Sequence, residues 1–139
     1  MTAPLKAGAP RAIADRRGIK LAKDNTTQHS AMVNLIRLAL GRIPDLVLWP
    51  NPVKNVEIVT GNGGLIRMRT GLAVGSADLI GILAGRFIAL EVKTGDGFAK
   101  PHQEQWLALV RAKGGFAAVV WSVLEACEAI DRARQGKSE

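Results

Sequence analysis

The chain has 139 residues, of which 47% are hydrophobic and 22% are charged, and its net charge is +7. These values predict a globular protein with one domain, and they exclude a disordered chain and a membrane span, because every apolar stretch is shorter than a bilayer requires. The basic N-terminus lacks the apolar segment of a secretory signal, so we expect a cytoplasmic protein. The positive charge favours nucleic acid as the partner, with a membrane surface as the alternative anion.

Residues 1–25 differ in composition from the rest of the chain. Residues 1–23 carry many Lys and Arg side chains against the single acid Asp15, and prolines and glycines interrupt them. At most a short helix over residues 12–17 is expected there. The segment is either a partly disordered, solvated arm or a segment that binds a phosphate backbone. We therefore divide the chain into a basic arm, a single folded domain over residues 26–135 and a short tail over residues 136–139.

A helix and the start of a sheet follow the arm. Apolar residues at helical spacing predict a helix from Thr26 or Thr27 to about Leu40, and Gly41 ends it. Residues 46–49 are apolar and bounded by prolines, which predicts a short strand.

The next segment reads as a basic hairpin. Residues 56–60 and 65–69 alternate in polarity around a glycine-rich turn, which places Arg67 and Arg69 on one face. These arginines could lie on a DNA duplex, or they could form the exposed polar face of an edge hairpin.

A second hairpin follows, and its register can be predicted. Residues 78–83 and 86–93 are apolar and strand-like, and Ala84-Gly85 between them indicates a turn of two residues. Counting back from this turn in antiparallel register pairs Leu79 with Leu90.

The same register sets Asp78 directly opposite Glu91. Directly opposed residues have Cβ atoms about 5 Å apart, so the two carboxylates would repel each other unless a cation or a shared proton lay between them. Lys93 lies two residues beyond Glu91 and therefore on the same face of the sheet. A divalent metal is the simplest cation for this site.

The rest of the chain completes a mixed sheet with helices. A helix is expected over residues 102–113, and the apolar run of residues 116–121 predicts a central strand covered on both faces. Ser122 and Glu125 form a capping box that opens a last helix, which ends at about Arg134. The fold class is therefore α/β, with a mixed sheet flanked by helices.

These motifs together carry a resemblance to a known family. Asp78 at the base of one strand, Glu91-Val92-Lys93 at the end of the next and Gln103 on the following helix resemble the PD-(D/E)xK nuclease superfamily. More narrowly, the chain resembles the VRR-NUC family over about residues 27–131, through Gly75-Ser76-Ala77-Asp78, the strand ending at Lys93, Thr94-Gly95, Gln103-Glu104-Gln105-Trp106 and Gly114-Gly115. The resemblance implies a restriction-endonuclease-like core. It also implies a virus-type, homodimeric, structure-selective DNase, with Holliday junctions as the favoured substrate, in a bacterium or a phage-infected cell.

The chemistry of the residues agrees with a nuclease. Hydrolysis of a phosphodiester requires an activated water and a stabilised phosphate, and Mg²⁺ or Mn²⁺ held by oxygen ligands provides both. Asp78, Glu91 and the main-chain carbonyl of Val92 are the expected ligands. Lys93 would hold the water or stabilise developing charge, and Gln103 could orient water or phosphate but could not act as a base.

Other residues are candidates for supporting roles. Lys100 and His102, at the start of the predicted helix, could contact DNA, and the alternative for His102 is an exposed residue of a helix start. The family often has a Glu near the start of its first helix, where this chain has Gln28 and His29. His29 could replace that ligand or contact phosphate. The missing acid favours a second hypothesis, in which the chain is a catalytically weak or inert nucleic-acid-binding module that keeps the nuclease fold.

Overall fold

The computed structural model describes residues 19–21 and 27–139. These residues belong to two compact units: residues 27–53 and 71–139 form the larger one, and residues 54–70 with the strand at residues 19–21 form the smaller one. The helix expected over residues 12–17, and most of the basic arm, lie outside the described residues. In the described part of the chain, no helix has both the length and the apolar character needed to cross a membrane.

The larger unit is an α/β fold with a mixed sheet, as predicted. Its strands are β2 (Leu46–Pro50), β5 (Leu79–Leu83), β6 (Arg86–Val92) and β7 (Phe116–Val120), in the spatial order β2-β5-β6-β7. The pairs β2–β5 and β5–β6 are antiparallel, whereas β6 and β7 are parallel. In the part of the chain that the structure describes, three helices flank the sheet, namely α2 (Thr27–Leu40), α3 (Pro101–Ala112) and α4 (Val123–Arg134). This arrangement is consistent with a restriction-endonuclease-like core.

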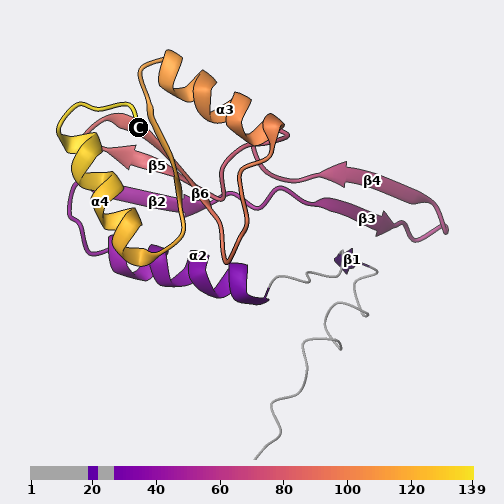
Figure 1. Cartoon of the computed structure of the whole chain (residues 1–139). Coiled ribbons are helices and arrows are strands. Elements are labelled where there is room, and N and C mark those ends of the chain that lie inside the picture. Colours follow the sequence, from indigo (N-terminus) through magenta and orange to yellow (C-terminus); the bar gives the residue numbers. More distant parts are fainter. Residues whose placement is uncertain (1–18, 22–26) are drawn as a thin grey trace, which may run out of the picture. The chain divides into compact units, whose positions relative to one another are not determined.

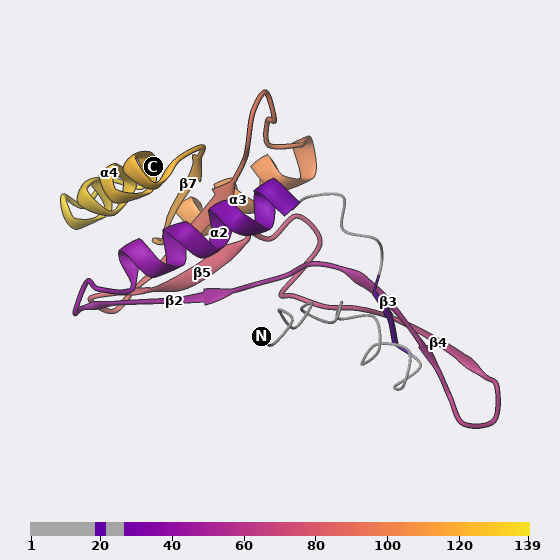
Figure 2. The ribbon, with the colours of Figure 1, turned by 90° about the horizontal axis from the view of Figure 1, so that it is seen from below.

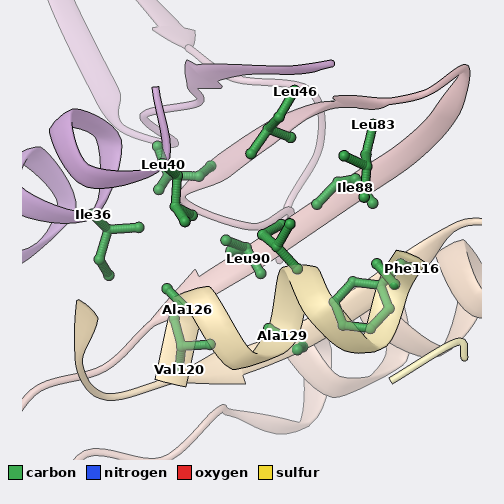
Figure 3. Close-up of a cluster of buried hydrophobic side chains, with 14 of the residues drawn as sticks. Ile36, Leu40, Leu46, Leu83, Ile88, Leu90, Phe116, Val120, Ala126 and Ala129 are labelled. Carbon is green, nitrogen blue, oxygen red and sulfur yellow. The ribbon is translucent and has the colours of Figure 1, made fainter. Parts of the chain in front are cut away.

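The helices cover both faces of the sheet. Figure 1 shows α3 on one side of the strands and α2 with α4 on the other, and Figure 2 shows α2 running along the sheet. The main hydrophobic cluster lies on the side of α2 and α4, where Ile36, Leu90 and Phe116 are fully buried (Figure 3). A smaller cluster around Leu107 and Ala117 lies under α3. Alternate residues of β6 thus face different helices, as strand geometry requires.

The turn between β5 and β6 has the predicted length and register. The paired residues run from Leu83↔Arg86 to Leu79↔Leu90, as the sequence predicted. Both turn residues, Ala84 and Gly85, have positive φ. This conformation matches the tight hairpin turns whose twist suits antiparallel strands.

One strand was wrongly placed by the sequence analysis. The strand β7 was expected in the centre of the sheet, but it is an edge strand. Its apolar sequence has a different cause, because α3 and α4 cover its two faces. Its free edge is also covered, since the amide of Ala117 donates to the carbonyl of Ser138 (3.0 Å) and the Arg111 guanidinium donates to the carbonyl of Ala117 (2.9 Å). The C-terminal residues therefore occupy part of an edge that would otherwise expose backbone groups.

The smaller unit is an antiparallel sheet in the order β1-β3-β4. The strands β3 (Asn55–Val59) and β4 (Leu65–Arg69) form the predicted hairpin, while β1 (Ile19–Leu21) was not predicted. Every residue of β4 is exposed.

Candidate functional site

The candidate site begins where β5 and β6 continue past their last paired residues. Asp78 precedes β5, and its carboxylate Oδ2 accepts a hydrogen bond from the main-chain N–H of Val92 on the neighbouring strand (2.8 Å). The paired register ends at Leu79↔Leu90, and Asp78 and Glu91 are the next residues beyond this pair on the two strands. Strand alternation places both residues on the side of the sheet that α3 covers.

Glu91 is a buried carboxylate with only one satisfied oxygen. The residue is 2% exposed, and its Oε1 accepts from the amide of Gln103 (2.8 Å) and lies 3.1 Å from the ammonium of Lys93. Its Oε2 is buried and has no hydrogen-bond partner in the described part of the chain. An unsatisfied buried acceptor of this kind costs about 1–3 kcal/mol, so it calls for a functional explanation.

The surroundings of Glu91 oppose its ionisation. Burial, and next the negative charge of Asp78, raise the pKa of Glu91 from 4.5 to about 7, whereas Lys93 and His29 act in the opposite direction. A carboxyl group in this state can keep a proton near neutral pH, and a bound cation would release that proton by stabilising the carboxylate.

Lys93 and Gln103 hold each other as well as Glu91. The Lys93 ammonium donates to Oε1 of Gln103 (2.9 Å), and the same oxygen accepts from the main-chain N–H of Lys100 at the start of α3 (2.9 Å). The Lys93 side chain is only 16% exposed. The amide of Gln103 is therefore fixed in one orientation, and it bridges the Glu91 carboxylate and the Lys93 ammonium.

His29 joins the site from the first turn of α2. Its Nε2 lies 3.2 Å from Oδ2 of Asp78 and 3.1 Å from the main-chain oxygen of Val92. The hydrogen bond to Asp78 is the main reason that the pKa of His29 is raised, and partial burial opposes this effect. The residue predicted to replace the missing acid therefore touches two of the predicted ligands.

Other predicted residues do not join this cluster. Gln28 is exposed and, among the described residues, no hydrogen bond links it to the cluster. His102 is also exposed, and Lys100 contributes its main chain rather than its ammonium group. Arg67 and Arg69 belong to the smaller unit, so they form a separate feature.

The hairpin arginines lie on a polar face of the smaller unit. Arg67 pairs with Glu57 (3.2 Å), and Arg69 donates to the side chain of Asn55 (3.3 Å). These residues line an open hollow of about 630 Å³. Because the Arg67 side chain is largely exposed, its pairing with Glu57 adds little stability and leaves the guanidinium accessible to an anion.

Asn51 is a positioning residue that the sequence analysis missed. It is buried, and its amide donates to the Ser76 hydroxyl and to the Ala77 carbonyl (2.8 Å each), while its Oδ1 accepts from the N–H of Leu72 (2.9 Å). Its own N–H donates to the carbonyl of Asp78 (2.7 Å). Hydrogen bonds from Asn51 thus hold the loop that precedes Asp78 against the end of β2. A polar residue between two prolines at the end of a strand was the available signal.

Gly75 lets the same loop approach α3 closely. Its φ is +83°, and a Cβ at this position would lie 2.4 Å from the carbonyl oxygen of His102. Only glycine accommodates both the backbone angle and this approach.

No protein-family model matches this sequence, and no curated protein matches it significantly. The resemblance to the VRR-NUC family therefore remains a prediction that rests on the motif residues.

The donor atoms of the cluster are suitable for a hard divalent cation. Among residues 19–21 and 27–139, no three or more His, Cys, Asp or Glu side chains are arranged to hold a metal ion. A cation here would therefore need the carbonyl of Val92 and water in addition to Asp78 and Glu91. The partnerless Oε2 of Glu91 is the observation that fits such an ion, since carboxylate and carbonyl oxygens are the ligands that Mg²⁺ and Mn²⁺ prefer.

Proposed function

We propose that this protein is a divalent-metal-dependent endonuclease that hydrolyses phosphodiester bonds in DNA, with branched DNA such as Holliday junctions as its substrate. The single observation that carries the proposal is the half-satisfied Glu91 carboxylate, buried beside Asp78 and held by Lys93 and Gln103. A buried carboxylate oxygen without a partner among the described residues costs stability, and a cation bound to that oxygen would offset the cost.

Asp78, Glu91 and the carbonyl of Val92 would hold Mg²⁺ or Mn²⁺. When bound, the cation would supply positive charge that stabilises the phosphate in the transition state and makes a nearby water more acidic. The protein supplies the ligands in place, because Asp78 is fixed by the N–H of Val92 and Glu91 by Gln103.

Lys93 would act on the phosphate or on the attacking water. Its ammonium is held 3.1 Å from Glu91 and bonded to Gln103, so its charge is positioned before substrate binds. Such pre-organised charge in a partly buried site stabilises developing negative charge more strongly than charge in water does. Gln103 would keep the Lys93 ammonium and the Glu91 carboxylate in fixed positions relative to each other.

The charge of the chain supports DNA as the partner. The net charge is +7, and Arg67 and Arg69 present guanidinium groups on an exposed hairpin. Lys100 and His102 are exposed at the start of α3, next to Gln103. Phosphate contacts by such side chains position a duplex without reading its sequence. We propose further that the enzyme acts as a homodimer that cuts two strands, in the cytoplasm of a bacterium or of a phage-infected cell.

A second candidate function is a DNA-binding module without catalysis. Two observations favour it: α2 has no acid in its first turn, and Lys93 already pairs with one of the two acids. In this alternative the ion pair and the hydrogen bonds of Gln103 would serve stability, and DNA binding would depend on salt but not on metal.

Cleavage assays separate the two functions. Labelled four-way junction, flap and linear duplex DNA would be incubated with Mg²⁺, Mn²⁺ or EDTA and with the wild type, Lys93→Ala or the control Lys113→Ala, which removes an exposed lysine outside the cluster. The nuclease proposal predicts metal-dependent cleavage by the wild type and the control, and none by Lys93→Ala. Junction binding without cleavage under any condition would instead establish the binding module.

A further inference from the structure

The loop between β6 and α3 (residues 93–100) carries an exposed aromatic ring. Phe98 is 77% exposed, the highest value among the large hydrophobic residues in the part of the chain that the structure describes. Isolated apolar residues are common on protein surfaces, so exposure alone assigns no role to this ring. Its position beside the candidate site is the informative feature.

Both ends of this loop take part in the hydrogen bonds of the candidate site. Lys93 is its first residue and Lys100 its last, and Oε1 of Gln103 accepts from the Lys93 ammonium and from the main-chain N–H of Lys100 (2.9 Å each). Phe98 lies two residues before Lys100, so the Cα atoms of these two residues are at most about 7 Å apart. The ring is therefore attached close to the groups that the proposed function assigns to the phosphate.

Hydrogen bonds hold the backbone next to Phe98 in place. The N–H of Gly97 donates to the carbonyl of Thr94 (3.0 Å), and the carbonyl of Gly97 accepts from the indole Nε1 of Trp121 (2.9 Å). Trp121 directly follows β7, the strand that pairs with β6. The peptide group that joins Gly97 to Phe98 is therefore bonded to the end of the sheet, and the exposed ring extends from a backbone that is already positioned.

The surroundings of the ring favour an unpaired nucleobase as its contact. Lys93 and Lys100 are the ends of the loop and Asp96 is its single acid, so the loop has a positive balance. Proteins bind single-stranded DNA with such a combination, because bases stack on aromatic rings while cationic groups contact the phosphates. In a continuous duplex each base already stacks on its neighbours, and an unpaired base gives up the least energy when it moves onto a side chain.

We propose that Phe98 stacks on an unpaired base next to the phosphate bound at the candidate site, and that this contact makes the protein prefer DNA with unpaired bases over a continuous duplex. The inference rests on the proposed function, since it takes DNA as the substrate, and it names the feature of that DNA which is recognised. It makes Phe98 a specificity-determining residue that takes no part in the chemistry.

Binding in EDTA tests the role of the ring without cleavage. Fluorescence anisotropy would give the affinities of the full chain for a labelled flap with an unpaired strand and for a continuous duplex. The proteins would be the wild type, Phe98→Ala, Phe98→Trp and the control Leu38→Ala, which removes an apolar residue of α2 that is 72% exposed. We expect Phe98→Ala to lower the affinity for the flap by about tenfold or more and to leave the affinity for the duplex unchanged. Phe98→Trp and Leu38→Ala should keep the preference of the wild type for the flap.

Photocrosslinking locates the contact. Flaps that carry 5-iodouracil at successive positions of the unpaired strand would be irradiated in complex with the wild type, and mass spectrometry would identify the crosslinked residue. We expect a crosslink to Phe98 from a position next to the branch, and none from positions within the paired arms.

The possible outcomes separate this inference from the proposed function. Equal losses of flap and duplex affinity in Phe98→Ala, no loss of either, or crosslinks to other residues alone would overturn the role of Phe98, even if the wild type cleaves DNA. A flap preference that depends on Phe98, in a protein that cleaves no DNA with Mg²⁺ or Mn²⁺, would support the base contact and overturn the nuclease. Equal affinities of the wild type for the flap and the duplex would overturn this inference and leave the nuclease to the cleavage assays.

Discussion

Replacing Glu91 by Gln should remove most of the pH dependence of stability of the metal-free protein. The substitution keeps the size of the side chain, and its amide oxygen can still accept from Gln103 and Lys93. It removes the carboxyl group whose pKa burial, and next the charge of Asp78, raise from 4.5 to about 7. The reasoning concerns the pH dependence of unfolding rather than the absolute stability of the variant.

The sign and size of the effect follow from linkage between protonation and folding. Between pH 4.5 and about 7 the folded state of Glu91 binds more proton than the unfolded state, so the free energy of unfolding falls as pH rises. The stabilising contribution is complete below pH 4.5 and is lost as pH passes through about 7. At about 1.4 kcal/mol per pKa unit, the total loss is about 3 kcal/mol. The raised pKa of His29 acts in the same direction, in a window that begins near its ordinary value of 6.5.

Urea unfolding in EDTA would measure the effect. The free energy of unfolding would be determined between pH 4.5 and pH 8.5 for the wild type, for Glu91→Gln and for Glu128→Gln, which removes an exposed carboxylate on α4. We expect Glu128→Gln to follow the wild type, and Glu91→Gln to lose about 3 kcal/mol less than the wild type over this range. Parallel pH profiles for the wild type and Glu91→Gln would refute the claim that Glu91 is a buried acid with a raised pKa.

Three further substitutions test the supports of the site and of the sheet. Asn51→Ala should lower the free energy of unfolding by about 3 kcal/mol, because three hydrogen bonds of about 1 kcal/mol each are lost from a buried residue. A loss below about 1 kcal/mol in urea unfolding would show that other contacts hold the loop. Gly75→Ala should destabilise the protein by about 2 kcal/mol and weaken Mn²⁺ binding, since the added Cβ would displace the loop that carries Asp78. An unchanged thermal midpoint and Mn²⁺ affinity would contradict this. Arg86→Ala should lower the free energy of unfolding by about 2 kcal/mol, because the guanidinium donates to main-chain carbonyls after α3, within α4 and in the C-terminal tail. Arg86→Lys should recover little of this loss, because an ammonium lacks the planar arrangement of donors. Full recovery by lysine in a thermal melt would show that charge alone is needed.

The strand register was predictable because two independent constraints agree. A two-residue turn fixes which residues face each other, and the period of two in a strand then fixes every later pair. Asp78, Glu91 and Lys93 could therefore be placed on one face from sequence, and the contacts among Glu91, Lys93 and Gln103 agree with this placement. Local geometry carries this part of the prediction, so no knowledge of the helices was needed.

The positions of β7 and Asn51 were not predictable in the same way. An apolar run reports that a strand is covered on both faces, but it does not report whether another strand lies at its edge. In this fold the helices cover the faces of β7, and the tail and Arg111 cover its edge. The role of Asn51 likewise depends on a loop that returns to it from later in the chain, and no local pattern specifies such a partner.

The position of His29 in the site could not be predicted from the spacing of residues along the sequence. It is separated from Val92 by 63 positions, and it reaches the site only because α2 packs against the sheet through Ile36 and Leu40. The same packing aims the first turn of α2 at the ends of β5 and β6. A different side chain at position 29 would therefore change the contacts of the Asp78 carboxylate and of the Val92 carbonyl. The imidazole pairs with Asp78, and Glu91 is then the second acid of the site.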